Sequence, residues 1–189
     1  MMSTGLAAET YLDVGLEVLA ERGYGSLKLA VVCNRVGVTT GAFYHHFANW
    51  STYTRALVEH WRQRCTLALL AEVRGEADPR VRIDRLITIG LELPHRAESA
   101  IRAWSSVDAD VHAAQADVDR QRHAILRESA IEILHEPRQA DLFAQWALYL
   151  LIGYEQATIP DDLRALQWLV AQLVSALDTG RFATVPDPI

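Results

Sequence analysis

The chain has 189 residues, of which 50% are hydrophobic and 22% are charged, so a disordered chain is excluded. Its net charge of −6 argues against a protein that coats nucleic acid without regard to sequence. The longest apolar run, Trp146–Tyr154, is too short to span a bilayer, and Glu9 and Asp13 interrupt the N-terminus too early for a signal peptide, so the cytoplasm is the expected location.

Hydrophobic residues repeat at helical spacing almost throughout the chain. Gly23 ends the first stretch with this helical spacing, Gly37 makes a turn, and Pro137 separates two later helices. The pattern predicts helices at about residues 7–22, 27–34, 39–46, 51–74, 80–93, 97–106, 108–134, 139–157 and 160–178. No strand is predicted, so we expect an all-α fold of about nine helices, followed by a frayed tail at residues 184–189.

The fourth predicted helix carries a stripe that is apolar until its last turn. Its members follow helical spacing and are Leu57, Trp61, Cys65, Ala68 and Glu72. We expect this stripe to face the core.

Residues Leu27–Phe47 have the outline of a helix-turn-helix, whose second helix fits the major groove of DNA. An apolar run that includes Leu29, Val32 and Cys33 ends at Arg35, and Gly37 supplies the turn. Thr39 is the expected N-cap of the second helix.

The second helix of this motif is rich in aromatic residues. Phe43 and Phe47 are expected to lie in the core. Tyr44, His45 and His46 cannot all face inward beside them, so some of the three must be exposed. An exposed Tyr-His pair at this place favours DNA contact over plain core packing.

The glycine-valine turn and the positions after it resemble the tetracycline-repressor (TetR) family of bacterial transcription regulators. The matching residues are Gly23, Leu29, Val32, Val36-Gly37-Val38 and Gly41–Phe47, within a match that covers about residues 7–60. The resemblance implies a homodimer with a DNA-binding domain at 1–50 and a ligand-sensing and dimerisation domain at 51–189. It also implies a near-palindromic double-stranded DNA operator, from which a small, largely apolar or aromatic effector releases a repressor.

The same resemblance implies roles for individual residues. Thr39 and Thr40 would meet phosphates or base edges, and Gly41 and Ala42 would allow close approach to the groove. Tyr44 resembles the family's phosphate-contacting tyrosine, and the two histidines after it would attract DNA when charged. The complete DNA-binding set is Lys28, Thr39, Thr40, Gly41, Ala42, Tyr44, His45 and His46.

Three positions depart from the family pattern. Lys28 stands where many members have a capping threonine, so the cap is lost unless Ser26 substitutes for it. Ala30 replaces a residue that is often basic, and Trp50 replaces the usual lysine before the fourth helix. Fewer ionic contacts with DNA are therefore expected than in a typical member.

Aromatic residues of the helical body are candidates for an effector pocket, with polar residues between them. The predicted ligand-binding set is Trp61, Arg102, Trp104, Gln121, Phe143, Trp146 and Tyr149. Core packing is the alternative for any single aromatic residue. Gln121 and Arg122 interrupt an apolar stripe, which indicates a polar environment, although Arg122 can also extend its charged end to solvent.

The last two predicted helices are apolar on more than one side, which predicts an additional partner for the last helix. The resemblance to the TetR family implies that these helices pair with their copies, in a dimer interface that comprises Phe143, Leu166, Leu169, Val170, Leu173 and Val174. The alternative is that a neighbouring helix of the same chain covers these residues.

Two other functions stay open. One is a DNA-binding protein that has lost effector control or answers to a protein partner, and the other is a helical small-molecule-binding protein or enzyme with an altered DNA head. The enzyme hypothesis has little support, because the sequence has no nucleophile elbow, phosphate loop or HExxH motif. The two cysteines and the histidines lack metal-ligand spacing, so no catalytic residue, metal or cofactor is expected.

Overall fold

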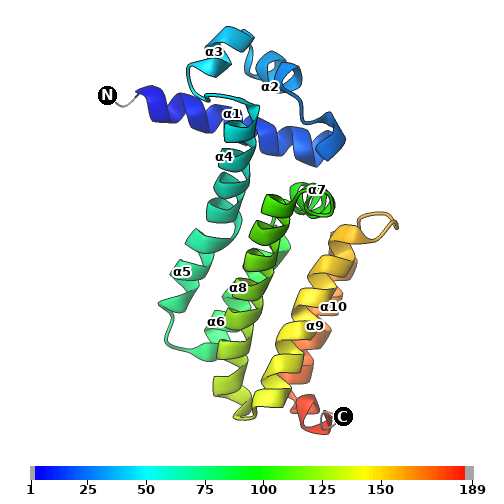
Figure 1. The fold of residues 1–189 in the computed structure, drawn as a ribbon. Coiled ribbons are helices and arrows are strands. Elements are labelled where there is room, and N and C mark those ends of the chain that lie inside the picture. Colours follow the sequence, from blue (N-terminus) through cyan, green and yellow to red (C-terminus); the bar gives the residue numbers. More distant parts are fainter. Residues whose placement is uncertain (1–2, 186–189) are drawn as a thin grey trace. The chain divides into compact units, whose positions relative to one another are not determined.

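A computed structural model describes residues 3–185, which form ten α-helices and no strand (Figure 1). The all-α prediction is confirmed. The helices are α1 (Ser3–Arg22), α2 (Leu29–Val36), α3 (Thr40–Tyr44), α4 (Trp50–Arg62), α5 (Ala68–Arg74), α6 (Pro79–Glu92), α7 (His95–Ser105), α8 (Ala109–Leu134), α9 (Pro137–Gln156) and α10 (Leu163–Asp178). Short 3-10 turns form η1 (Tyr24–Ser26) and η3 (Arg181–Thr184), and η2 (Gln63–Leu67) is π-helical. Residues 186–189 of the predicted frayed tail lie outside the described part.

The chain forms two compact units. Unit 1 contains the residues up to Cys65 together with Pro94–Ala116, and unit 2 contains Thr66–Leu93 and the chain from Asp117 onward. None of the helices within residues 3–185 is long and apolar enough to cross a membrane.

The π-helical turn η2 corrects the predicted stripe of the fourth helix. Helix continues from α4 through η2 into α5, as expected, but the exposed residues Ala68 and Glu72 do not continue the buried face. The side chain of Cys65 lies outside the described part, and the buried positions described from there to the end of α5 are Thr66, Leu70 and Val73. A π turn holds one more residue than an α turn, so it shifts the inward face by one position.

In unit 1, α1 packs against α2, α4 and α7. The hydroxyl of Tyr53 on α4 donates a hydrogen bond to the carbonyl oxygen of Tyr11 on α1, 2.9 Å away. Gly15 lies at this crossing, because a Cβ there would stand 2.2 Å from the Tyr53 hydroxyl and 2.9 Å from a methyl group of Leu57. The absence of a side chain at Gly15 thus lets α1 and α4 approach closely.

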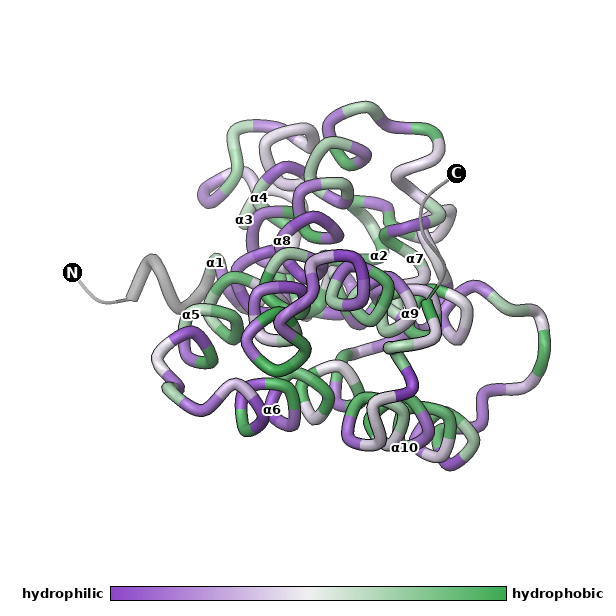
Figure 2. Tube along the Cα trace, turned by 90° about the horizontal axis from the view of Figure 1, so that it is seen from below, coloured by the Kyte–Doolittle hydropathy of each residue, from purple (hydrophilic) through white to green (hydrophobic). Residues whose placement is uncertain are grey.

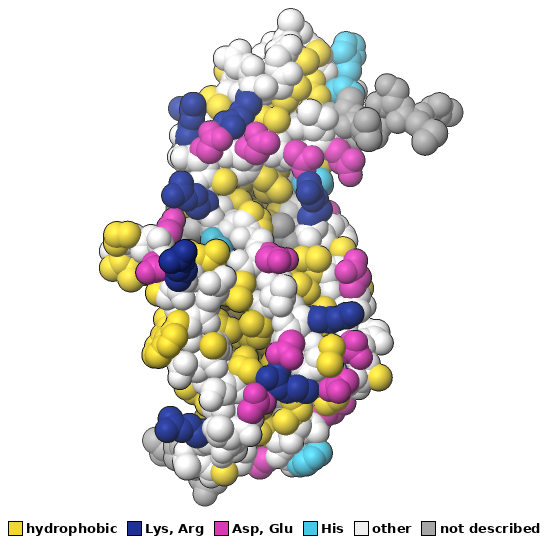
Figure 3. Space-filling view, turned by 180° about the vertical axis from the view of Figure 1, so that it is seen from behind, with side chains coloured by type: hydrophobic (Ala, Val, Ile, Leu, Met, Phe, Trp, Pro, Cys, Tyr) yellow, Lys and Arg dark blue, Asp and Glu magenta, His cyan; other side chains and the backbone are white. Residues whose placement is uncertain are grey.

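In unit 2, α5, α6, α8, α9, α10 and η3 share one apolar core, to which Ile125, Phe143, Leu173 and Phe182 contribute. Hydrophobic positions along these helices appear green in Figure 2. Not all hydrophobic side chains of these helices lie in the core, because Figure 3 shows some at the surface on the side of α9 and α10.

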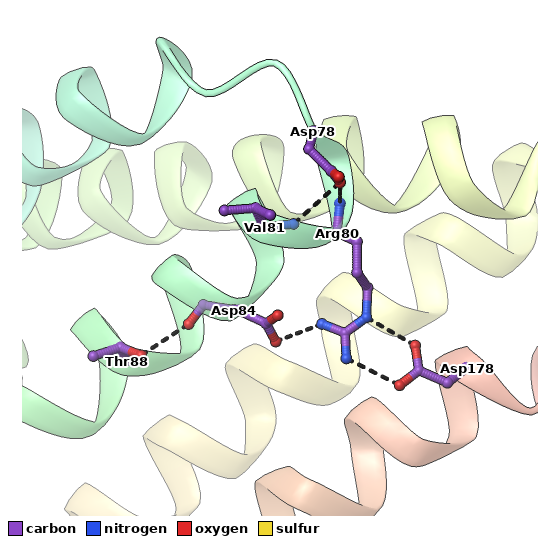
Figure 4. Close-up of polar contacts among 6 residues, drawn as sticks. All are labelled: Asp78, Arg80, Val81, Asp84, Thr88 and Asp178. Carbon is purple, nitrogen blue, oxygen red and sulfur yellow. Dashed lines mark hydrogen bonds and ion pairs between the residues drawn. The ribbon is translucent and has the colours of Figure 1, made fainter.

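Hydrogen bonds and ion pairs link α6 to the end of α10 (Figure 4). The guanidinium of Arg80 donates to both carboxylate oxygens of Asp178, at 2.8 and 2.9 Å, and also pairs with Asp84. Asp78 caps α6 by accepting hydrogen bonds from the backbone N–H groups of Arg80 and Val81. Asp178 is the main cause of the raised pKa of Arg80.

Candidate nucleic-acid interface

Helix α2 begins without a side-chain cap. Lys28 occupies the N-cap position, is exposed, and makes no capping hydrogen bond. The hydroxyl of Ser26 donates instead to the carbonyl oxygen of Arg22, at 3.2 Å, so Ser26 does not replace the missing cap. Val32 and Cys33 are buried as predicted, and burial raises the pKa of the Cys33 thiol.

Gly37 makes the turn between α2 and α3, as predicted. Its φ of 81° lies in the left-handed region that favours glycine. The backbone N–H groups of Gly37 and Val38 both donate to the carbonyl oxygen of Cys33, at 2.9 and 3.0 Å. This pattern closes the end of α2 and redirects the chain within two residues.

Helix α3 is capped by Thr39, as predicted. The hydroxyl of Thr39 accepts a hydrogen bond from the backbone N–H of Ala42, at 3.3 Å. The helix ends at Tyr44 rather than near residue 46, because the N–H of His46 bonds to the carbonyl of Phe43 in a tighter, 3-10-type turn. It therefore presents little more than one turn to a partner.

Two buried phenylalanines hold this short helix in place. Phe43 and Phe47 are buried, as predicted, and both pack against Tyr11 of α1 and Tyr53 of α4. Burial raises the pKa of the Tyr53 phenol.

The predicted DNA-contacting residues of the second helix therefore gather on one short element. Thr39, Thr40, Gly41 and His45 are exposed, and Tyr44 is 52% exposed. Ala42 and His46 are half-buried, and the His46 ring lies 5.3 Å from that of Tyr11. The position of these side chains suits them for contact, while their roles in DNA binding stay predictions.

The start of α4 shows what replaces the usual lysine. Asn49 caps the helix by accepting a hydrogen bond from the backbone N–H of Thr52, at 2.8 Å. Trp50 is half-buried and stacks on Tyr53, with ring centroids 4.8 Å apart. The tryptophan thus extends the aromatic cluster, where a lysine would offer a charge.

Several cations of unit 1 are paired within the chain. Arg35 of α2 binds Glu21 and Glu17 of α1, and it holds the pKa of Glu21 below its ordinary value. Asp13 of α1 pairs with His60 of α4 and with Arg64 of η2.

Three cations near the motif have no such partner. Within the described part of unit 1, Arg22, Lys28 and Arg55 are exposed and form no ion pair. They are the side chains available to neutralise phosphates, and Arg22 and Arg55 were absent from the predicted set.

The predicted effector residues of unit 1 lie on α4 and α7. Trp61 and Trp104 are both buried, and Arg102 is half-buried. The Trp61 indole N–H donates to the carboxylate of the buried Glu98, at 2.7 Å. Sequence reasoning missed Glu98, although its spacing of three residues from Ile101 places it on the apolar face of α7.

The predicted effector residues of unit 2 have different environments. Gln121 is half-buried and bonds to Asp117, and Phe143 is fully buried in the core. Trp146 and Tyr149 are 43% and 66% exposed and line an open pocket of about 460 Å³ with Phe182 of η3.

The alternative in which Arg122 extends to solvent is wrong. Arg122 is 7% exposed and donates a hydrogen bond to the hydroxyl of Thr66, at 3.1 Å, and Thr66 is also buried. The interruption of the apolar stripe thus marks a polar contact inside the protein. No cluster of three metal-ligating side chains occurs among the residues the structure describes.

The predicted dimer residues divide into two groups. Phe143, Leu166 and Leu173 are already covered by their own chain. Leu169 is 42% exposed, and Val170 and Val174 are half-buried. Trp168, 63% exposed, and Leu163, 42% exposed, also belong to the exposed apolar surface of α10.

Comparison with known proteins identifies the motif. Residues 12–49 match the family model described as bacterial regulatory proteins, tetR family. The helix-turn-helix segment of this chain is therefore similar to that of TetR-family regulators.

Curated TetR-family relatives match part of the chain. The HTH-type transcriptional regulator BetI of Proteus mirabilis is 23% identical over 95 residues, which are 49% of this chain and 48% of BetI. The transcriptional regulator AcuR of Cereibacter sphaeroides is 37% identical over 54 residues, which are 29% of this chain and 25% of AcuR. The match therefore spans about half or less of the length of these relatives.

Solved structures share the fold over most of the chain. A TetR transcription regulator from Haloarcula marismortui has a TM-score of 0.76 at 16% identity, covering 93% of this chain and 98% of its own. A transcriptional regulator from Saccharomonospora viridis, in complex with choline, has a TM-score of 0.75 at 14% identity, covering 92% and 96%. At these identities the likeness concerns the fold alone.

Proposed function

We propose that this protein is a homodimeric transcription regulator of the TetR family that binds a near-palindromic operator through α2 and α3. The observation that carries the proposal is the presentation of α3, since buried Phe43 and Phe47 fix a helix whose capped N-terminus and Tyr44 are exposed. The N-terminus of a helix is a favourable place for a phosphate.

In this proposal Thr40 and Tyr44 meet phosphates or base edges in the major groove, and Lys28 adds an ionic contact at the start of α2. Ala42, which has no hydrogen-bonding side chain, suits a thymine methyl group. Two such helices, one from each subunit, read half-sites about one helical turn apart.

The proposed partner for the exposed face of α10 is a second copy of the chain. Trp168 and Leu169 are large apolar side chains that the described chain leaves uncovered, and Tyr149 of α9 adds to them. Large aromatic side chains in the centre of an interface contribute much of its binding energy.

The proposed control is a small effector that prefers a conformation of the dimer unable to bind DNA. Support comes from aromatic residues such as Trp61 and Trp146 and from the choline complex of the S. viridis neighbour, because aromatic rings attract organic cations as well as apolar groups. The test is release of operator DNA by a small-molecule panel that includes choline. Release that Trp146→Ala abolishes supports the predicted site, and unchanged binding with every compound favours a constitutive DNA-binding protein.

The DNA-binding proposal is tested by selecting fragments of the source genome with the purified protein, at low and moderate salt, and sequencing the bound fraction. We expect enrichment of one near-palindromic site. A matched selection with His45→Ala, an exposed position on the same turn, should reduce the enrichment. A flat profile at low salt would remove the proposal.

A further inference from the structure

Helix α7 is attached at two points to the elements that carry the helix-turn-helix within unit 1. Towards the start of α7, Glu98 accepts the 2.7 Å hydrogen bond from Trp61 of α4. At its end, Trp104 stacks on Tyr24 of η1, with ring centroids 4.7 Å apart and ring planes 12° from parallel. The first attachment reaches the helix that follows α3, and the second reaches the turn that precedes α2.

The stacked tyrosine lies immediately before α2. The backbone N–H of Leu27 donates to the carbonyl oxygen of Tyr24, at 2.9 Å, which closes the 3-10 turn. The next residue, Lys28, is the N-cap of α2, and its carbonyl accepts from the N–H of Val32, at 3.0 Å. The hydrogen-bonded backbone therefore runs without a break from Tyr24 to the first turn of α2.

Besides α1, which also packs against η1 and α2, helix α7 contacts the η1 turn. Helix α2 has no side-chain cap, so its start is fixed by the backbone turn and by the burial of Leu27. The Tyr24 ring is 38% exposed and Trp104 is 2% exposed, so the stack covers only part of the tyrosine. The Trp104 indole N–H has no hydrogen-bond partner among the described residues, so packing alone holds that ring.

We propose that the Tyr24–Trp104 stack is a positioning contact through which α7 and the start of α2 respond to each other. The inference rests on the proposed function, because it takes operator DNA as the ligand of α2 and α3. Since coupling between two sites is reciprocal, DNA bound at the helix-turn-helix alters the surroundings of Trp104. An aromatic stack contributes modestly to stability, so its loss leaves the fold intact.

Fluorine NMR of the full-length protein labelled with 5-fluorotryptophan tests the proposal. The chain has five tryptophans, which are assigned with single Trp→Phe variants. The protein is titrated with the selected operator fragment, and anisotropy of the labelled DNA measures binding in the same samples. We expect the Trp104 resonance to shift on binding.

Two variants of Tyr24 separate coupling from packing. In Tyr24→Ala we expect DNA binding to persist within about tenfold, while the DNA-induced shift of Trp104 is lost. Tyr24→Phe keeps the ring and should retain the shift.

The outcomes are distinct. Binding without a shift of Trp104, or an undiminished shift in Tyr24→Ala, overturns the positioning role and leaves the DNA-binding proposal standing. Absence of DNA binding by the wild-type protein removes the proposed function and this inference with it.

Discussion

At the scale of single residues, Gly15 is a position in unit 1 where a side chain cannot be added without a steric clash. The Tyr53 hydroxyl reaches across it to the Tyr11 carbonyl, and a Cβ would stand 2.2 Å from that hydroxyl. Because the hydroxyl belongs to a buried ring, it cannot move aside without disturbing Phe43 and Phe47. The position of α3 therefore depends on a residue far from it in sequence.

We expect Gly15→Ala to lower the free energy of unfolding by about 1–3 kcal/mol through overpacking. Gly90→Ala is the matched control, because a Cβ in that part of α6 meets nothing within 4 Å and alanine favours a helix. Chemical denaturation of both variants makes the comparison. Equal stabilities would contradict the tight crossing.

At the scale of elements, ion pairs link α1 to α2, the first helix of the helix-turn-helix. Arg35 hydrogen-bonds to Glu21 and pairs with Glu17 at 3.2 Å. The hydrogen bond from Arg35 lowers the pKa of Glu21 in the folded protein. Its contribution to stability is present above the unfolded-state pKa, about 4.3, and is lost as pH falls through the lower folded-state value.

Glu21→Gln should therefore lower the Tm at pH 7, and this difference should shrink as pH falls through the folded-state pKa of Glu21. Glu9→Gln in the same helix is the control, because Glu9 forms no ion pair among the described residues. Thermal melts of the two variants between pH 7 and 3 measure the difference. A Tm difference for Glu21→Gln that is independent of pH would contradict the assignment.

The sequence predicts the elements well and their finer contacts less well. The left-handed turn at Gly37, the Thr39 cap and the burial of Phe43 follow from local chemistry, so they could be predicted. The buried contact of Arg122 with Thr66 could not, because a periodic pattern does not reveal a π turn that moves the inward face by one residue.

At the scale of the whole molecule, the proposed dimer would carry two lightly charged DNA-binding heads. Each head offers Arg22, Lys28 and Arg55 as cations without an ion pair among the described residues. The exposed apolar surface of α10 is the proposed junction between subunits. The salt dependence of DNA binding tests the role of these cations, and the strength of self-association tests the role of the α10 surface.

The slope of log K for operator binding against log salt concentration should be no steeper than about −5, as expected for about six phosphate contacts per dimer. Lys28→Ala should reduce the slope by about two, one for each head. Anisotropy titrations between 50 and 200 mM salt, roughly the range over which such slopes are measured, provide both values. A slope near −10 would mean that phosphate contacts have been undercounted.

Trp168→Ser should weaken self-association by tenfold or more, because it removes a large exposed aromatic side chain from the proposed interface; one factor of ten is about 1.4 kcal/mol. Val107→Ser is the control, since Val107 is 73% exposed and lies between α7 and α8. Sedimentation velocity over a range of concentrations compares the two. If Trp168→Ser and Val107→Ser dimerise with the same affinity, the dimer interface does not include Trp168.

The affinity of Tyr44→Ala for the selected operator fragment decides whether α3 reads DNA. Tyr44 is 52% exposed, so its removal should leave the Tm nearly unchanged. We expect Tyr44→Ala to bind the operator about tenfold or more weakly than the wild-type protein, because the change removes contacts to the nucleic acid from each head. Wild-type affinity in Tyr44→Ala would contradict the assignment of α3 as the helix that reads DNA.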